Sequence, residues 1–105
     1  MKMIKAIVRP EKADIVVRAL DEAGFISMTK LDVFGRGKQK GLTVGGIHYD
    51  ELPKVMFLLV VDDESLDAAV DTIIDAAKTG NFGDGKIFIT PVIKAYTIST
   101  GKEEL

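Results

Sequence analysis

The chain has 105 residues, 47% of them hydrophobic and 29% charged, with a formal net charge of −2. This length supports one core, so we expect a single domain spanning residues 1–105. The slightly acidic balance argues against a general nucleic-acid binder and leaves any anion site to local cations. The sequence has no cysteine and one histidine, His48, which excludes disulfides and argues against a zinc site.

No apolar run approaches the roughly 18 residues of a membrane span, and the N-terminus has no signal-peptide hydrophobic region. The lack of cysteine also suits a reducing compartment. We therefore expect a cytoplasmic protein that is not an integral membrane protein.

The first third of the chain predicts a strand, a helix and a second strand. Residues 2–9 alternate apolar and polar side chains, which is typical of a strand with one core face. From Glu11 to Ala23 apolar residues recur at helical spacing, and Gly24 stands where glycine commonly ends a helix. Residues 25–34 favour a strand, but their alternation slips, which predicts a bulge or a strand that uses both faces.

The second half repeats this order. Residues 55–61 are an unbroken apolar run, typical of a strand buried on both faces. A helix is expected next, capped by Asp62 or Asp63 and ended by Gly80. Its predicted buried stripe is Leu66, Ala69, Val70, Ile73 and Ala77.

The C-terminal part predicts two more extended segments. An apolar strand is expected at 87–89, and residues 92–98 are expected to form a last strand after Pro91. The charged tail, residues 102–105, is expected to be loose.

The order βαβ–loop–βαβ predicts an α+β, ferredoxin-like sandwich, with both helices on one face of a four-stranded antiparallel sheet. The other face would then stay apolar, because residues 55–61 are apolar on both sides and Ile7 projects from the otherwise charged side of its strand. An open apolar face of this size seldom stays exposed in a monomer. We therefore expect an oligomer with ligand clefts between subunits.

A glycine-rich loop, about residues 35–54, separates the two halves. Glycine backbones can approach an anion closely, and the interleaved cations carry the matching charge. The alternative is a mobile hairpin loop whose cations are merely solvated. The glycines are Gly35, Gly37, Gly41, Gly45 and Gly46, and the polar residues between the first three are Arg36, Lys38, Gln39 and Lys40.

A second glycine loop, residues 79–86, reads T-G-N-F-G-D-G-K. It contains G-x-x-x-x-G-K, the first part of a phosphate-binding P-loop. However, Ile87 stands where the magnesium-binding hydroxyl is needed, and the loop joins a helix to a strand instead of a strand to a helix. A helix cap followed by a tight turn is the structural alternative.

Two enzyme or nucleic-acid interpretations are poorly supported. No nucleophile, base and orienting group occur in a recognisable pattern, so we expect no catalytic residues. An RNA-recognition domain has the same order of elements but needs several aromatics on its central strands. Residues 55–61 supply one, Phe57.

Three motifs together resemble the PII family of nitrogen-regulatory signalling proteins: V-F-G-R-G-K-Q-K-G, E-L-P-K-V and T-G-N-F-G-D-G-K-I-F. The similarity covers nearly the whole chain and is greatest to the archaeal-type subgroup encoded among nitrogenase genes. The resemblance implies a trimer, or a mixed oligomer with a paralogous PII subunit. It also implies clefts that bind ATP or ADP, together with Mg2+ and 2-oxoglutarate.

The resemblance also implies roles for single residues. Gln39 would coordinate the Mg2+ that bridges ATP and 2-oxoglutarate, and Lys54 would pair with the distal carboxylate of 2-oxoglutarate. The nucleotide-binding residues would be Ile7, Thr29, Gly35, Gly37, Lys38, Val60, Gly83, Asp84, Gly85, Lys86, Thr97 and Ser99. The 2-oxoglutarate-binding residues would be Gly37, Gln39, Lys40, Gly41 and Lys54, and the target contacts Val44, Ile47 and Tyr49.

This sequence departs from the family at two places. The R-x-R pair of the usual C-terminal strand is replaced by Thr97 and Ser99. Tyr49 does not align cleanly with the tyrosine that is uridylylated in enteric members. We therefore expect weaker nucleotide binding with poorer selection of ATP over ADP, and we do not expect uridylylation of Tyr49.

These motifs lead to a hypothesis of a non-enzymatic sensor of adenylates and 2-oxoglutarate that regulates nitrogenase by protein contact. Within the same class, the target is alternatively an ammonium channel or glutamine synthetase. From other classes, the alternatives are a slow ATPase and an interaction module without ligand.

Overall fold

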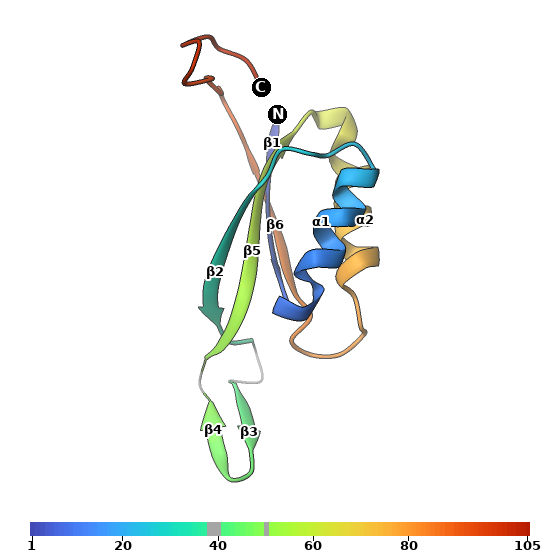
Figure 1. Cartoon of the computed structure of the whole chain (residues 1–105), viewed down its shortest axis with the longest axis vertical. Coiled ribbons are helices and arrows are strands. Elements are labelled where there is room, and N and C mark those ends of the chain that lie inside the picture. The colour runs from blue at the N-terminus through green and yellow to red at the C-terminus, as the bar shows by residue number, and fades with distance from the viewer. Residues whose placement is uncertain (38–40, 50) are drawn as a thin grey trace.

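The computed structural model describes residues 1–37, 41–49 and 51–105; Lys38, Gln39 and Lys40, expected at the site, lie outside these ranges. The described residues form a four-stranded sheet with two α-helices, and a two-stranded hairpin projects from one end of the sheet (Figure 1). The strands are β1 (Lys2–Val8), β2 (Thr29–Gly35), β3 (Leu42–Val44), β4 (Ile47–Tyr49), β5 (Leu52–Val61) and β6 (Gly85–Pro91). The helices are α1 (Ala13–Glu22) and α2 (Leu66–Ala77), preceded by the short 3-10 helices Pro10–Lys12 and Asp63–Ser65.

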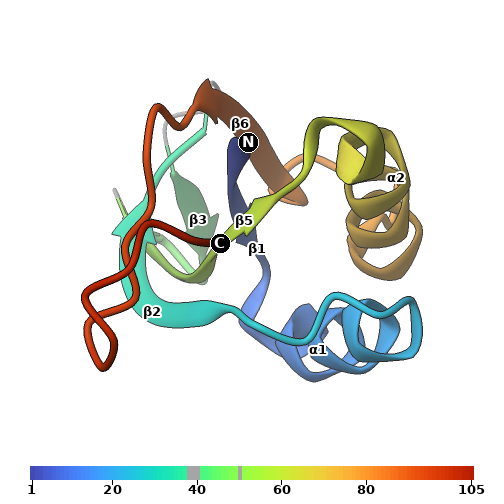
Figure 2. The same cartoon turned by 90° about the horizontal axis from the view of Figure 1, so that it is seen from above.

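The sheet has the strand order β2-β5-β1-β6, and each neighbouring pair is antiparallel. Both helices cover the same face, as the view from above shows (Figure 2). This confirms the predicted ferredoxin-like α+β fold. Of the two explanations expected for the slipped alternation, the bulge is wrong, because the β2–β5 register runs unbroken from Thr29–Leu58 to Gly35–Leu52. The slip in alternation lies before Thr29, where the strand has not yet begun.

The core lies between this sheet face and the helices. β1 buries Ile4, Ala6 and Val8, and β5 buries every second residue from Val55 to Val61. The helical spacing predicted the helix faces correctly, since α1 buries Ala13, Val16 and Leu20 and α2 buries Ala69, Ile73 and Ala77. Phe57 at the centre of β5 is fully buried, so its truncation to alanine should cost about 3–5 kcal/mol.

The other face of the sheet has no second layer within the chain. On β5 Met56, Leu58 and Val60 are only half-buried, so the prediction of a strand buried on both faces does not hold for one protomer. On the same face Leu31 of β2 and Phe88 of β6 are 39% and 48% exposed. Two helices cover one face of a sheet, and they leave these apolar side chains open to contact.

The helix ends follow the sequence signals in part. Gly24 (φ 92°) ends α1 as predicted. Its amide and that of Phe25 donate to the carbonyls of Asp21 and Leu20 at 3.0 and 2.8 Å, a full Schellman motif.

The second helix differs from the prediction at both ends. It ends at Ala77, three residues before Gly80, and the Asp62 side chain makes no capping hydrogen bond. Asp63 instead pairs with the N-terminal amine, 3.1 Å away, and with Lys2. These pairs lower the pKa of Asp63, the hydrogen bond from the N-terminal amine most of all.

The C-terminal segment corrects two expectations. Residues 92–98 form no strand of the sheet, because β6 ends at Pro91. One further amide, that of Val92, donates to the Met1 carbonyl at 3.1 Å, and beyond it the described residues form an isolated bridge, Tyr96–Glu103. The tail is also not loose, since the Thr97 amide donates to the Lys102 carbonyl and the Glu104 amide to that of Ala95, both at 2.9 Å. In the single chain this segment folds back on itself and leaves the sheet (Figure 1).

Candidate functional site

The candidate site begins where β1 ends, in a row of three charged side chains. The strand registers place Val8 opposite both Val55 of β5 and Gly85 of β6. One residue further, the same registers bring Arg9 beside Lys54 and Asp84. The sequence positions are far apart, but the sheet gathers the three charges at one end.

Asp84 organises the second glycine loop from within. Its carboxylate accepts hydrogen bonds from the Thr79 hydroxyl, from the amides of Thr79 and Gly80 at 2.9 Å each, and from Arg9 Nε at 3.1 Å. These donors, the Thr79 hydroxyl foremost, hold the pKa of Asp84 well below its usual range. The side chain is therefore a charged carboxylate whose hydrogen bonds stabilise the loop. Because its carboxylate oxygens are occupied and negatively charged, the predicted contact of Asp84 with a ligand phosphate would have to come from its backbone amide.

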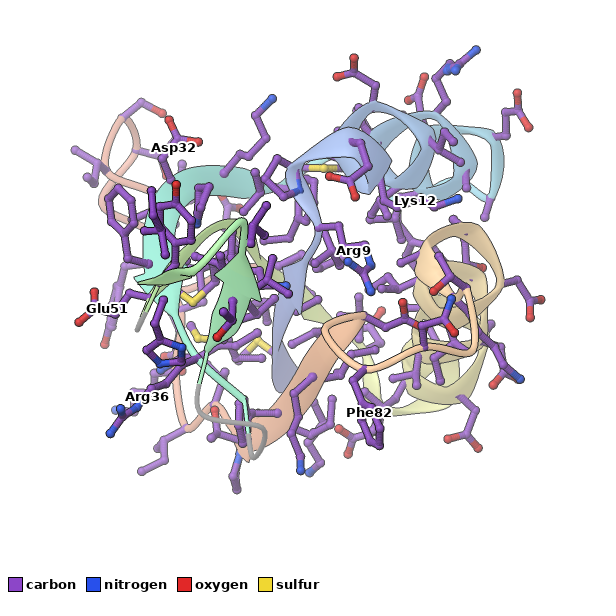
Figure 3. The ribbon with its side chains drawn as sticks, turned by 90° about the horizontal axis from the view of Figure 1, so that it is seen from below. Arg9, Lys12, Asp32, Arg36, Glu51 and Phe82 are labelled. Atoms are coloured by element: carbon purple, nitrogen blue, oxygen red, sulfur yellow. The ribbon has the colours of Figure 1, made fainter. Side chains whose placement is uncertain are left out.

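Two successive carbonyls of the loop are held by cations. Arg9 Nη2 donates to the Phe82 carbonyl at 2.7 Å, and Lys54 Nζ donates to the Gly83 carbonyl at 2.5 Å. Figure 3 shows Arg9 extending toward this loop while the Phe82 ring points away from it. Burial lowers the pKa of Lys54, Arg9 lowers it further, and Glu11 and Asp84 act in the opposite direction.

Lys54 also connects the two glycine loops. The sequence placed it at the exit of the first loop, but β5 begins at Leu52, so Lys54 lies on a strand opposite Val33 of β2. A rigid strand therefore fixes the ammonium group that the resemblance assigns to 2-oxoglutarate. In this structure the same group contacts the second loop.

The first glycine loop is a projecting hairpin instead of an irregular connection. β3 and β4 pair from Leu42–Tyr49 to Val44–Ile47 around Gly45 and Gly46. Both glycines have positive φ (56° and 81°), which a two-residue turn of this kind requires. The expected target contacts are exposed on it, Val44 by 55%, Ile47 by 58% and Tyr49 by 46%.

The remaining predicted nucleotide residues divide between the two ends of the sheet. Ile7 lies opposite Lys86 and Met56. Gly35 lies at the same end of the sheet but on β2, opposite Leu52 at the start of β5. Val60 lies opposite Met3, four residues further along β1, which is about 13 Å at 3.3 Å per residue. Thr29 begins β2 opposite Leu58, between these two positions.

Thr97 and Ser99 lie further away still, in the C-terminal turn beyond β6 (Figure 1). Of the predicted residues, one protomer thus places Ile7, Gly35, Lys54 and the second glycine loop at one end of the sheet, with a direct contact between Lys54 and the loop. It does not bring together these residues and the C-terminal turn. Gly37 and Gly41 border the undescribed stretch 38–40, and the expected metal ligand Gln39 falls within that stretch.

A groove of about 480 Å³ adjoins this end of the sheet. Ile7, Gly85 and Lys86 form one wall, and α2 forms the other with Val70, Ile73 and Ile74. Of the predicted nucleotide-binding residues, Ile7, Asp84, Gly85 and Lys86 line it.

Arg9 and Thr79 are the residues that sequence reasoning missed. Arg9 was counted as an ordinary polar residue of the first strand, and nothing in its local pattern links it to Asp84, 75 positions away. Thr79, just ahead of the glycines, could have been suspected as a partner of Asp84. Among the described residues no cluster of metal-ligating side chains occurs, and no helix is long and apolar enough to cross a membrane.

Fold and site together define a ferredoxin-like α+β domain with two glycine-rich loops at one end of its sheet. A family model described as nitrogen regulatory protein P-II matches residues 1–102, and the chain belongs to this family. It is 57% identical over all 105 residues of both chains to "Nitrogen fixation nifHD region GlnB-like protein 1" of Methanobacterium ivanovii. It is 58% identical over 102 residues, 97% of each chain, to the protein of the same name from Methanothermococcus thermolithotrophicus. These relatives match the nitrogenase-operon subgroup that the motifs indicated.

Proposed function

We propose that this protein is a non-enzymatic signalling subunit that binds ATP or ADP, with Mg2+ and 2-oxoglutarate, and regulates nitrogenase by direct contact. Membership of the P-II family establishes nitrogen regulation as the general role. The observation that carries the finer proposal is the hydrogen bond from Lys54 to the Gly83 carbonyl. It joins the segment expected to bind the oxo-acid to the segment expected to bind phosphate, so one ligand can influence the other.

The chemistry of the joined loops suits anionic ligands. Lys54, Lys86 and Arg9 lie at one end of the sheet, and the charged carboxylate of Asp84 is occupied by hydrogen bonds from Arg9, Thr79 and Gly80. Glycine amides and cations make charge-assisted contacts to phosphate and carboxylate oxygens. If Mg2+ binds, Gln39 would be its expected protein ligand, and the ion would supply positive charge for phosphate and carboxylate oxygens.

The division of the site between two ends of the sheet supports an oligomer. In one protomer Val60 and the turn bearing Thr97 and Ser99 cannot meet the second glycine loop. A neighbouring copy, or a paralogous PII subunit, packed on the open apolar face could bring its own C-terminal turn to this loop. We propose a trimeric assembly on this ground.

Nitrogenase is proposed as the target because the relatives carry names that place them in a nifHD region. The exposed apolar hairpin β3–β4 is the proposed contact. An ammonium channel or glutamine synthetase remains the alternative target, and pull-down from a nitrogen-starved lysate, with and without ATP plus 2-oxoglutarate, distinguishes them.

Two measurements test the assembly and the absence of catalysis. Light scattering at micromolar concentration should give three times the chain mass of 11.4 kDa, and a monomer would remove the intersubunit site. ATP turnover should stay far below about 1 per second, the lower end for phosphoryl-transfer enzymes. Faster turnover would favour the ATPase alternative.

A further inference from the structure

Arg9 makes two contacts to the second glycine loop that no other described side chain makes together. Its Nε donates to Asp84 Oδ1 at 3.1 Å, and its Nη2 donates to the Phe82 carbonyl at 2.7 Å. The guanidinium also packs on Gly83, since a Cβ added there would lie 3.2 Å from Arg9 Nη2. The ion pair is three-quarters buried, with 25% and 23% of the two side chains exposed.

These contacts determine which way the loop amides point. In a trans peptide the carbonyl and the following N–H point in opposite directions, and the chain has no cis peptide among its described residues. Arg9 holds the Phe82 carbonyl, so the Gly83 amide faces away from Arg9. Lys54 holds the Gly83 carbonyl, so the Asp84 amide faces away from Lys54.

The two outward amides have no hydrogen-bond partner within residues 1–37, 41–49 and 51–105. In the described part of the chain neither the Gly83 nor the Asp84 amide donates a hydrogen bond. Two successive free amides on a glycine-rich turn form a concave donor pair suited to an anion. The Asp84 carboxylate does not compete for them, because it accepts from Thr79, Gly80 and Arg9 instead.

We propose that Arg9 is a positioning residue that sets the phosphate-binding shape of the second glycine loop without touching the ligand. This inference rests on the proposed function, since it assumes that the loop binds nucleotide phosphates. The planar guanidinium matters because it spans a carboxylate and a carbonyl at once. A lysine ammonium carries the same charge but lacks this fixed fork.

The proposal predicts a selective loss. Removing the Arg9 guanidinium should disturb the Gly83 and Asp84 amides, which are the proposed donors to phosphate. The surface that contacts the adenine base should stay unchanged. Arg9→Met should therefore weaken ATP binding about tenfold, the scale of one charge-assisted contact, and change adenosine binding less than about twofold. Arg9→Lys should fall between Arg9→Met and the wild type.

The experiment measures ATP by titration calorimetry and adenosine by competition, using Arg9→Met, Arg9→Lys and the control Arg18→Met, an exposed arginine on α1. Thermal unfolding confirms that each variant folds. Equal losses for ATP and adenosine would show a general structural role and overturn the proposal. ATP binding within twofold of wild type in Arg9→Met would overturn it as well.

A second readout separates this inference from the proposed function. In the ligand-free protein the Gly83 and Asp84 amide resonances should shift in Arg9→Met and stay in place in Arg18→Met. If the wild type binds no ATP, the proposed function fails, yet these shifts still report whether Arg9 shapes the loop. Unchanged resonances in Arg9→Met would contradict the positioning role directly.

Discussion

The two glycine-rich loops have similar compositions and opposite structural settings. Hydrogen bonds from Arg9 and Lys54 hold the second loop to the body, and Asp84 closes it from within. The first loop instead forms a hairpin whose described residues beyond Gly41 are exposed, with a hydrogen bond between Thr43 and His48 across it. Glycines and cations alone therefore do not decide whether a loop forms a fixed cradle or a projection. The registers of the neighbouring strands decide which side chains can hold the loop in place.

The projection is large for a chain of this size. The radius of gyration is 15.5 Å and the longest extent is 54 Å, whereas a compact chain of 100 residues has a radius near 13 Å. A hairpin that reaches beyond the body is well placed to contact another protein. The second loop lies against the body, where a small ligand can be enclosed.

Removing the hairpin should give the largest contrast between the loops. Replacing Thr43–His48 by two glycines should abolish inhibition of the target, because the exposed Val44 and Ile47 are lost. ATP binding should stay unchanged, since the second loop is untouched. Inhibition assays and calorimetry on the same preparation test both halves. A shortened protein that still inhibits would end the claim for the hairpin.

A single added methyl group should also destabilise the protein more at the second loop than at the first. At Gly85 (φ 114°) a Cβ would lie 1.7 Å from the Ile7 carbonyl oxygen, so Gly85→Ala must displace β6 from β1. We expect a loss of about 3 kcal/mol or more in unfolding free energy, with ATP binding lost alongside.

The matched control for this substitution is Gly45→Ala on the hairpin. A Cβ there meets nothing within 4 Å, so only the left-handed backbone costs energy, about 1 kcal/mol. Denaturant unfolding compares the two variants. Equal losses would mean that the second loop is no more tightly held than the first.

Acid should act on the second loop through Asp84. Its folded-state pKa lies below the ordinary value of about 3.9. The carboxylate therefore contributes stability that is complete above that ordinary value and is lost as the pH falls toward the folded-state pKa. Asp84→Asn should destabilise the protein at pH 7, and the gap from wild type should narrow at pH 3.

Unfolding free energies at both pH values check this expectation. Asp71→Asn, an exposed position on α2, serves as the control and should show little gap at either pH. A gap for Asp84→Asn that stays constant between pH 7 and pH 3 would mean that the charge of Asp84 does not hold the loop.

The smallest expected effect concerns the C-terminal turn. If a neighbouring subunit brings Thr97 and Ser99 to the phosphates, then Thr97→Arg with Ser99→Arg should tighten ATP more than ADP. Each added charge-assisted contact is worth about 1.5–3 kcal/mol before costs, and the gain should shrink as salt rises. Calorimetry at two ionic strengths measures it, and an unchanged or weaker ATP affinity would place this turn away from the phosphates.

The fold was predictable because its elements are strongly periodic. Alternation predicted the buried face of β1, and helical spacing predicted that Val16, Leu20 and Ile73 are buried. Gly24 correctly predicted the end of α1. The extra strand at 92–98 was wrong because an extended apolar segment needs an edge to pair with. Propensity alone does not supply one.

The candidate site could be predicted from composition and resemblance, but the hydrogen bonds and ion pairs within it could not. Glycines and lysines identified both loops, yet the roles of Arg9 and Asp84 depend on which strands pair and in which register. The resemblance implies that Asp84 is one of the residues that bind the nucleotide, but it does not say what the carboxylate contacts. The structure shows a carboxylate that binds its own loop.

The central claim is that the two loops form one coupled ligand site, and 2-oxoglutarate binding tests it most directly. Calorimetric titration of 2-oxoglutarate should show binding with Mg-ATP and little with ADP or without nucleotide. Lys54→Met should remove about 2–4 kcal/mol of 2-oxoglutarate affinity. Because Lys54 also contacts Gly83, ATP affinity should fall slightly as well. Equal binding of 2-oxoglutarate in the presence and absence of Mg-ATP would contradict the account.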